Sequence, residues 1–72
     1  MTEKEFRALL AIEGKTLDVA EAIQDIGKDR KKGFIADVNK GLFVTLATSE
    51  FKKTRRSAVQ DLIKKYYKDA DH

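Results

Sequence analysis

Residues 34–47 read Phe-Ile-Ala-Asp-Val-Asn-Lys-Gly-Leu-Phe-Val-Thr-Leu-Ala, and the structure of this stretch decides the fold class. Apolar residues occupy alternate positions in two runs: Phe34, Ala36 and Val38, then Leu42, Val44 and Leu46. Alternation with a period of two is typical of β-strands that bury one face. Between the runs, Asn39-Lys40-Gly41 fits a three-residue hairpin loop whose glycine is left-handed. The stretch therefore predicts a β-hairpin.

A helix over residues 34–48 is the alternative interpretation. Four apolar residues also fit a helical stripe, namely Ile35, Val38, Leu42 and Leu46. The β-branched residues Val44 and Thr45 favour strands, as do the two glycines in and beside the stretch. We expect the hairpin on this balance.

Two helices are predicted before the hairpin. The first begins with a capping box from Thr2 to Glu5 and ends at Gly14. The second covers Thr16 to Ile26, with Thr16 as its N-cap and Gly27 at its end. Its apolar stripe is Val19, Ala22, Ile23 and Ile26, spaced at i, i+3, i+4 and i+7. Residues 28–33 would then form a charged loop.

A C-terminal helix is predicted after the hairpin. Ser57 and Gln60 have the spacing of a second capping box, and an apolar stripe follows at Val59, Leu62, Ile63 and Tyr66. Residues 50–56 would extend the second strand or add a short third one. The expected fold is therefore α+β, a single domain over residues 1–72 with two N-terminal helices, a β-hairpin and a C-terminal helix. Because a lone hairpin is only marginally stable in water, we also consider a homodimer that completes the sheet.

The charge of the chain is unevenly distributed. The 72 residues carry a net charge of +3. Residues 1–27 hold three cationic and six acidic side chains, whereas residues 28–72 hold twelve cationic and six acidic ones. An acidic first part and a basic remainder suggest a surface that binds a polyanion.

The residues needed for catalysis or for metal binding are missing from the sequence. There is no cysteine, and the single histidine is the final residue, His72. A zinc site therefore lacks its usual ligands, and Ser49 and Ser57 lack a histidine base. No glycine-rich phosphate loop is present. We expect a protein that is not an enzyme and that uses no metal and no cofactor.

The sequence predicts no membrane segment. No run of about eighteen apolar residues occurs, and the polar residues after Met1 do not resemble a signal peptide. Together with the lack of cysteine, this leads us to expect a complete cytoplasmic protein.

Three clusters of cations form the strongest functional signal. They are Lys28, Arg30, Lys31 and Lys32; Lys52, Lys53, Arg55 and Arg56; and Lys64, Lys65 and Lys68. Cations that lie within reach of one another bind phosphates by releasing counterions. The second cluster also precedes a helix, whose N-terminal amides favour anions. The main hypothesis is therefore a small regulatory protein that binds nucleic acid, with DNA as the expected polymer.

A protein-interaction module is the alternative function. Such an inhibitor or adaptor would dock on an acidic protein, and the basic clusters would steer the encounter. Ile35 and Phe43 lie on the less apolar face of the predicted hairpin and would contact the partner.

Overall fold

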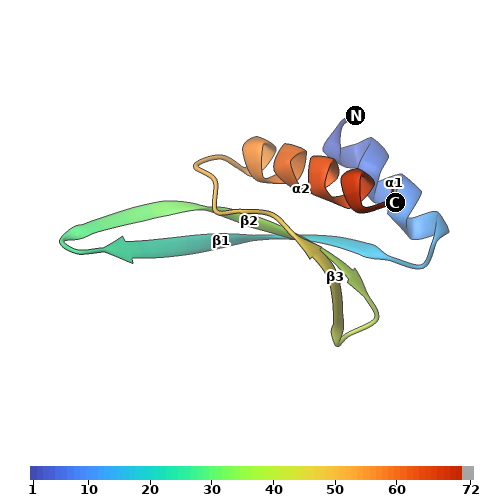
Figure 1. Ribbon diagram of the computed structural model, residues 1–72, viewed down its shortest axis with the longest axis horizontal. Coiled ribbons are helices and arrows are strands. Elements are labelled where there is room, and N and C mark those ends of the chain that lie inside the picture. Colours follow the sequence, from blue (N-terminus) through green and yellow to red (C-terminus); the bar gives the residue numbers. More distant parts are fainter. Residues whose placement is uncertain (71–72) are drawn as a thin grey trace.

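The computed structural model describes residues 1–70, with side chains as far as Lys68. Its elements are α1 (Glu3–Ile12), β1 (Thr16–Ile26), β2 (Asp29–Lys40), β3 (Val44–Thr48) and α2 (Arg55–Ala70). The strands form one antiparallel sheet in the order β1-β2-β3, and both helices lie on the same face of that sheet (Figure 1). The α+β class and the C-terminal helix are therefore confirmed.

The second predicted helix is wrong, because residues 16–26 form strand β1. All eleven residues of β1 pair with β2, from Thr16 opposite Asn39 to Ile26 opposite Asp29. Leu17 is buried and Val19 is partly buried, whereas Ile23 and Ile26 stay exposed. Pairing with a long neighbouring strand thus outweighs the local helical spacing, as tertiary contacts commonly do.

The predicted charged loop at residues 28–33 is also wrong. Lys28 lies in a two-residue turn after Gly27, whose φ of 62° suits a tight hairpin, and residues 29–33 belong to β2. The distal part of this β1–β2 hairpin, residues 21–34, projects beyond the helices, and we call it the arm (Figure 1). It helps to give the molecule its elongated shape, with extents of 43 × 25 × 24 Å. Most of the arm is exposed, and its exceptions are Ala22, Gly33 and Phe34.

The predicted β-hairpin exists as β2 and β3, so the helical alternative for residues 34–48 is wrong. Its loop lies further along the chain than expected, since Lys40 pairs with Val44 and the loop is residues 41–43. The register shifts beside Val38 and Asn39, so Leu46 is an extra residue in β3. Beyond β3, Lys52 forms one more antiparallel bridge with Phe34, and residues 50–56 therefore do not add a full strand.

Helix α1 begins and ends as the sequence predicts. The Thr2 side chain accepts a hydrogen bond from the Glu5 amide, and the Glu5 carboxylate accepts one from the Thr2 amide. At the other end, Gly14 has a φ of 72°, and the amides of Gly14 and Lys15 donate to Ala11 and Leu10. This pair of bonds is a Schellman motif, which satisfies the last carbonyls of the helix.

Helix α2 begins earlier than predicted. The amide of Ser57 donates to the hydroxyl of Thr54 at 3.1 Å, so Thr54 and not Ser57 caps the helix. Gln60 does not reach back to Ser57, and its side-chain amide instead donates to the carbonyl of Met1. Arg55 and Arg56 therefore lie in the first turn of α2, where the helix dipole is positive.

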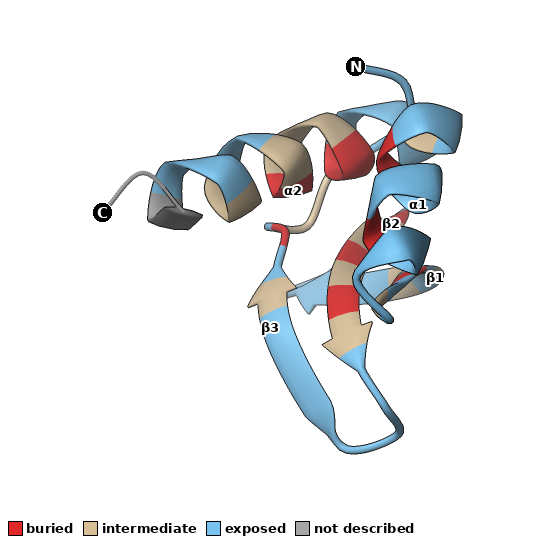
Figure 2. Ribbon diagram, turned by 90° about the vertical axis from the view of Figure 1, so that its right-hand side faces the viewer, coloured by how far each residue is buried: buried red, intermediate tan, exposed pale blue. Residues whose placement is uncertain are grey.

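The core fills the space between the two helices and the proximal half of the sheet. Its buried residues are Phe6, Leu10, Leu17, Ala36, Val38, Ala58, Val59 and Leu62. In Figure 2 these positions cluster where α1, α2 and β2 meet, and the arm lies outside them. Among the described residues, no helix is both long and apolar enough to cross a membrane.

Candidate nucleic-acid interface

The segment between β3 and α2 is held along the edge of β2. The amide of Ser49 donates to the carbonyl of Ala36 at 2.8 Å, and the Ser49 hydroxyl accepts from the Ala36 amide at 2.8 Å. Further along, Phe34 and Lys52 exchange two backbone hydrogen bonds of 2.7 and 3.0 Å. These bonds place Lys52 and Lys53 beside the base of the arm, directly before α2.

Asp61 anchors the same segment from within α2. Its carboxylate accepts a hydrogen bond from the backbone amide of Glu50 at 2.9 Å and lies 3.3 Å from the ammonium of Lys65. The Glu50 amide is the main reason why the pKa of Asp61 lies below its ordinary value of 3.8. A carboxylate whose pKa is lowered by folding stabilises the folded state at pH values above its ordinary pKa. This stabilisation is lost as the pH falls and the carboxylate becomes protonated.

We expect Asp61→Asn to lower the free energy of unfolding by about 1 kcal/mol at neutral pH, because it removes a charge-assisted hydrogen bond. The difference from the wild type should shrink as the pH falls below 3.8, where the wild-type carboxylate becomes protonated. Urea denaturation over a series of pH values measures both effects. Asp29→Asn is the control, since it removes the same charge from an exposed strand residue. An Asp61→Asn penalty that does not change with pH would contradict the role assigned to the charge.

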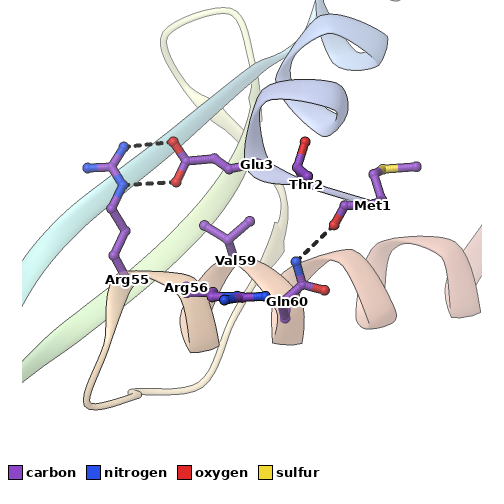
Figure 3. A pocket seen from close by; sticks show the side chains of 7 residues that line it. All are labelled: Met1, Thr2, Glu3, Arg55, Arg56, Val59 and Gln60. Atoms are coloured by element: carbon purple, nitrogen blue, oxygen red, sulfur yellow. Dashed lines mark hydrogen bonds and ion pairs between the residues drawn. The ribbon is translucent and has the colours of Figure 1, made fainter.

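Three shallow grooves meet around the start of α2. The first, of about 390 Å³, lies between the arm and residue 53, and we call it the arm groove; it is lined by Glu21, Ile23, Lys32, Gly33, Phe34 and Lys53. The second, of about 260 Å³, runs along α2 and is lined by Lys52, Ser57, Gln60, Asp61 and Lys64. The third, of about 420 Å³, lies between the N-terminal ends of α1 and α2 and includes Arg55, Arg56 and Val59 (Figure 3).

These grooves bring together members of all three predicted clusters. Lys32 joins Lys53 in the arm groove, Lys52 joins Lys64 beside α2, and Arg55 joins Arg56 in the third groove. We call these six residues the basic surface: Lys32, Lys52, Lys53, Arg55, Arg56 and Lys64. Lys52, Lys53, Arg55 and Arg56 lie at or just before the N-terminal end of α2, where unpaired helix amides add to the positive potential. Lys64 lies in the third turn of α2, and Lys32 lies on the arm.

Arg55 is the most strongly neutralised member of the basic surface. Its guanidinium donates two hydrogen bonds, of 2.9 and 3.0 Å, to the two carboxylate oxygens of Glu3 (Figure 3). Hydrogen bonding to Arg55 is the main cause that lowers the pKa of Glu3. This fork ties the start of α1 to the start of α2. Arg55 therefore contributes to structure as well as to the surface potential.

Three other cations of the predicted clusters have a carboxylate partner. The pairs are Arg30–Asp25 at 3.2 Å, Lys65–Asp61 at 3.3 Å and Lys52–Glu50 at 3.9 Å. In contrast, no ion pair within the described part of the chain involves Lys32, Lys53, Arg56 or Lys64. Most of the basic surface is thus available to an anion.

Other predicted cations lie away from this surface. Lys28 is in the turn at the tip of the arm, and Lys31 is on the strand face opposite to that of Lys32. Lys68 is in the last turn of α2, far along the helix from its start. The three clusters therefore do not form one continuous patch, and among their cations only the six residues of the basic surface line the three grooves.

The two predicted partner-contact residues are not brought together. Ile35 is half-buried within β2, whereas Phe43 is 95 % exposed in the loop between β2 and β3. The neighbouring Leu42 is 92 % exposed, and the sequence interpretation had placed it on the buried face of the hairpin. The shift of the loop by two residues explains this error, because it moves Leu42 out of the strand.

No protein-family model, no curated protein and no solved structure matches this chain. The fold and the basic surface together define it as a small α+β domain with a cationic helix start. Within the described residues, no three Asp, Glu, His or Cys side chains are grouped closely enough to hold a metal ion. His72 lies outside the described residues.

Proposed function

We propose that this protein binds nucleic acid, with DNA as the polymer, and that it acts by binding and not by catalysis. A regulatory role in the cytoplasm is part of this proposal. The observation that carries it is that cations without an ion-pair partner in the described part of the chain line three grooves along the arm and α2. Lys32 from the arm and Lys53 from the preceding segment line one groove, and Lys64 and Arg56 line its neighbours.

Phosphate binding is the chemistry that such a surface favours. Each phosphate that a lysine or arginine neutralises releases condensed counterions, so several cations within a few ångströms act together. The free amides at a helix start add directed hydrogen-bond donors for the same anions. The arm projects about 20 Å beyond this surface, since six residue pairs at about 3.3 Å each separate its base from its tip.

We expect the double variant Lys32→Ala, Lys53→Ala to weaken DNA binding about tenfold to a hundredfold at low salt, because two phosphate contacts are lost. The slope of log affinity against log salt should fall by about one to two units. Fluorescence anisotropy with a labelled oligonucleotide over a salt series measures both quantities.

Lys4→Ala, Lys40→Ala is the matched control for this experiment. It removes the same charge from two exposed lysines outside the basic surface and should leave the salt slope nearly unchanged. Equal losses in the two double variants would mean that net charge, and not this surface, governs binding. Absence of any salt-dependent binding by the wild-type protein would refute the proposal.

Protein binding is a second candidate function, and the loop between β2 and β3 favours it. Leu42 and Phe43 are almost fully exposed there, and Val44 beside them is half-exposed. A large apolar side chain at such a tip often anchors a protein contact. The loop lies at the end of the sheet away from the arm, so it leaves the basic surface free to steer an acidic partner (Figure 1). This candidate gains if the wild-type protein fails to bind DNA at low salt.

The homodimer considered from the sequence remains a proposal. Its original reason, that a two-stranded hairpin needs support, is weakened because β1 supplies a third strand from the same chain. Part of the outer edge of β1 is occupied, since the guanidinium of Arg7 donates to the carbonyl of Leu17 at 2.8 Å.

A further inference from the structure

The arm groove is lined by one acidic and two basic side chains that form no ion pair with one another. Glu21 lines the groove together with Lys32 and Lys53, and none of the three has an ion-pair partner within the described part of the chain. Its apolar lining is Ile23, which is 55 % exposed, and the half-buried ring of Phe34. A ligand that fills this groove must therefore satisfy a carboxylate, two ammonium groups and an apolar surface at once.

The charges in the groove argue against a phosphate as its only occupant. A phosphate would be attracted by both lysines but repelled by the carboxylate of Glu21, which lies in the same groove. Glu21 lies directly opposite Phe34 in the β1–β2 ladder, so the two side chains are neighbours on the same face of the sheet. A hydrogen-bond donor on a flat ring would suit that position better than an anion.

We propose that the arm groove binds an unpaired guanine base of a single strand, with Lys32 and Lys53 on the flanking phosphates. This inference rests on the proposed function and specifies its ligand. Guanine carries two adjacent donors, N1–H and the N2 amino group, which match the two oxygens of one carboxylate. The ring would lie against Ile23 and Phe34, since bases stack readily on apolar and aromatic side chains.

The base must be unpaired for this contact to form. In a duplex, N1–H and the amino group of guanine face cytosine, so a carboxylate cannot reach them together. Only strands, loops or ends with exposed Watson–Crick edges offer both donors. The volume of about 390 Å³ lies within the range of small-ligand sites and suits one nucleotide.

Two labelled strands of about twelve nucleotides test the inference: one of thymidine only, and one with a single central guanosine. Thymine offers one donor between two acceptors, so it cannot form the paired contact with Glu21. We expect the wild-type protein to bind the guanosine-containing strand about fivefold or more tightly. In anisotropy titrations of Glu21→Gln, most of this preference should disappear, while affinity for the thymidine strand stays equal or rises because a negative charge is lost.

Asp29→Asn is the matched control, because it removes the same charge from the arm at a position that does not line the groove. This variant should keep the guanosine preference. If the wild type shows no preference, or if Glu21→Gln keeps it, the guanine site is overturned while salt-dependent binding of both strands still supports the proposed function. If neither strand binds at low salt, both proposals fail. Circular dichroism of each variant confirms that the fold is retained.

Discussion

Replacing Gly33 by alanine should destabilise the protein by about 3 kcal/mol or more, although the change adds a single methyl group. Gly33 is buried in the middle of β2. A Cβ atom there would clash with the carbonyl oxygen of Lys52 and would lie 2.6 Å from the Phe51 ring. The carbonyl cannot easily move, because it accepts a hydrogen bond from the Phe34 amide at 2.7 Å. A domain of this size has a total stability of only about 4 to 10 kcal/mol.

Gly41→Ala is the comparison that isolates the steric cause. Gly41 has a φ of 70°, but a Cβ atom there would meet no other atom within 4 Å. Its replacement should cost only the strain of a left-handed alanine, about 1 to 2 kcal/mol. Urea denaturation of both variants gives the two free energies of unfolding. Equal costs at the two positions would show that residues 51 and 52 do not pack against Gly33 as described.

Truncating Phe6 to alanine should cost about 3 to 5 kcal/mol, the usual range for a buried phenylalanine. Phe6 is fully buried in α1 and packs against two rings of α2. Its ring centroid lies 5.6 Å from that of Tyr66 in an edge-on arrangement and 6.0 Å from that of Tyr67. Losing it would leave a cavity between the helices and remove the aromatic contacts as well.

Ile12→Ala is the control on the same helix. Ile12 is 82 % exposed, so its truncation should change the stability by less than about 0.5 kcal/mol. Thermal unfolding followed by circular dichroism ranks the two variants. A small cost at position 6 would contradict the packing of α1 against α2.

The sequence was sufficient to predict those elements whose signals are local. The capping box at Thr2, the left-handed Gly14 and the alternating residues of β2 each depend on neighbours within a few positions. β1 was not predicted because its strand character depends on pairing with residues of β2 that lie up to twenty-three positions further along the chain. The role of Gly27 was also ambiguous. A left-handed glycine can end a helix or begin a tight hairpin turn. The position of Gly27 in the sequence therefore could not distinguish a helix from a strand over residues 16–26.

The sequence was sufficient to predict which cations belong to the candidate site, but not which of them lie next to one another. Lys32 and Lys53 meet because the chain after β3 returns along β2 and pairs Lys52 with Phe34. No periodic pattern in the sequence predicts an isolated bridge of this kind. The same holds for Glu21, whose place beside Phe34 follows from the register of β1 against β2. A correct assignment of β1 as a strand would have revealed this pair.

The position of the arm outside the core has a consequence for its dynamics. Its distal pairs can fray from the Gly27 turn without disturbing Leu17, Val38 or the helices packed on them. Such a segment forms its own local unfolding unit, and its amides exchange with solvent at a lower free energy than those of the core. A ligand that binds the arm must therefore order its frayed pairs, and the entropy cost of this ordering lowers the affinity. The same flexibility lets the arm adjust its shape to the bound ligand.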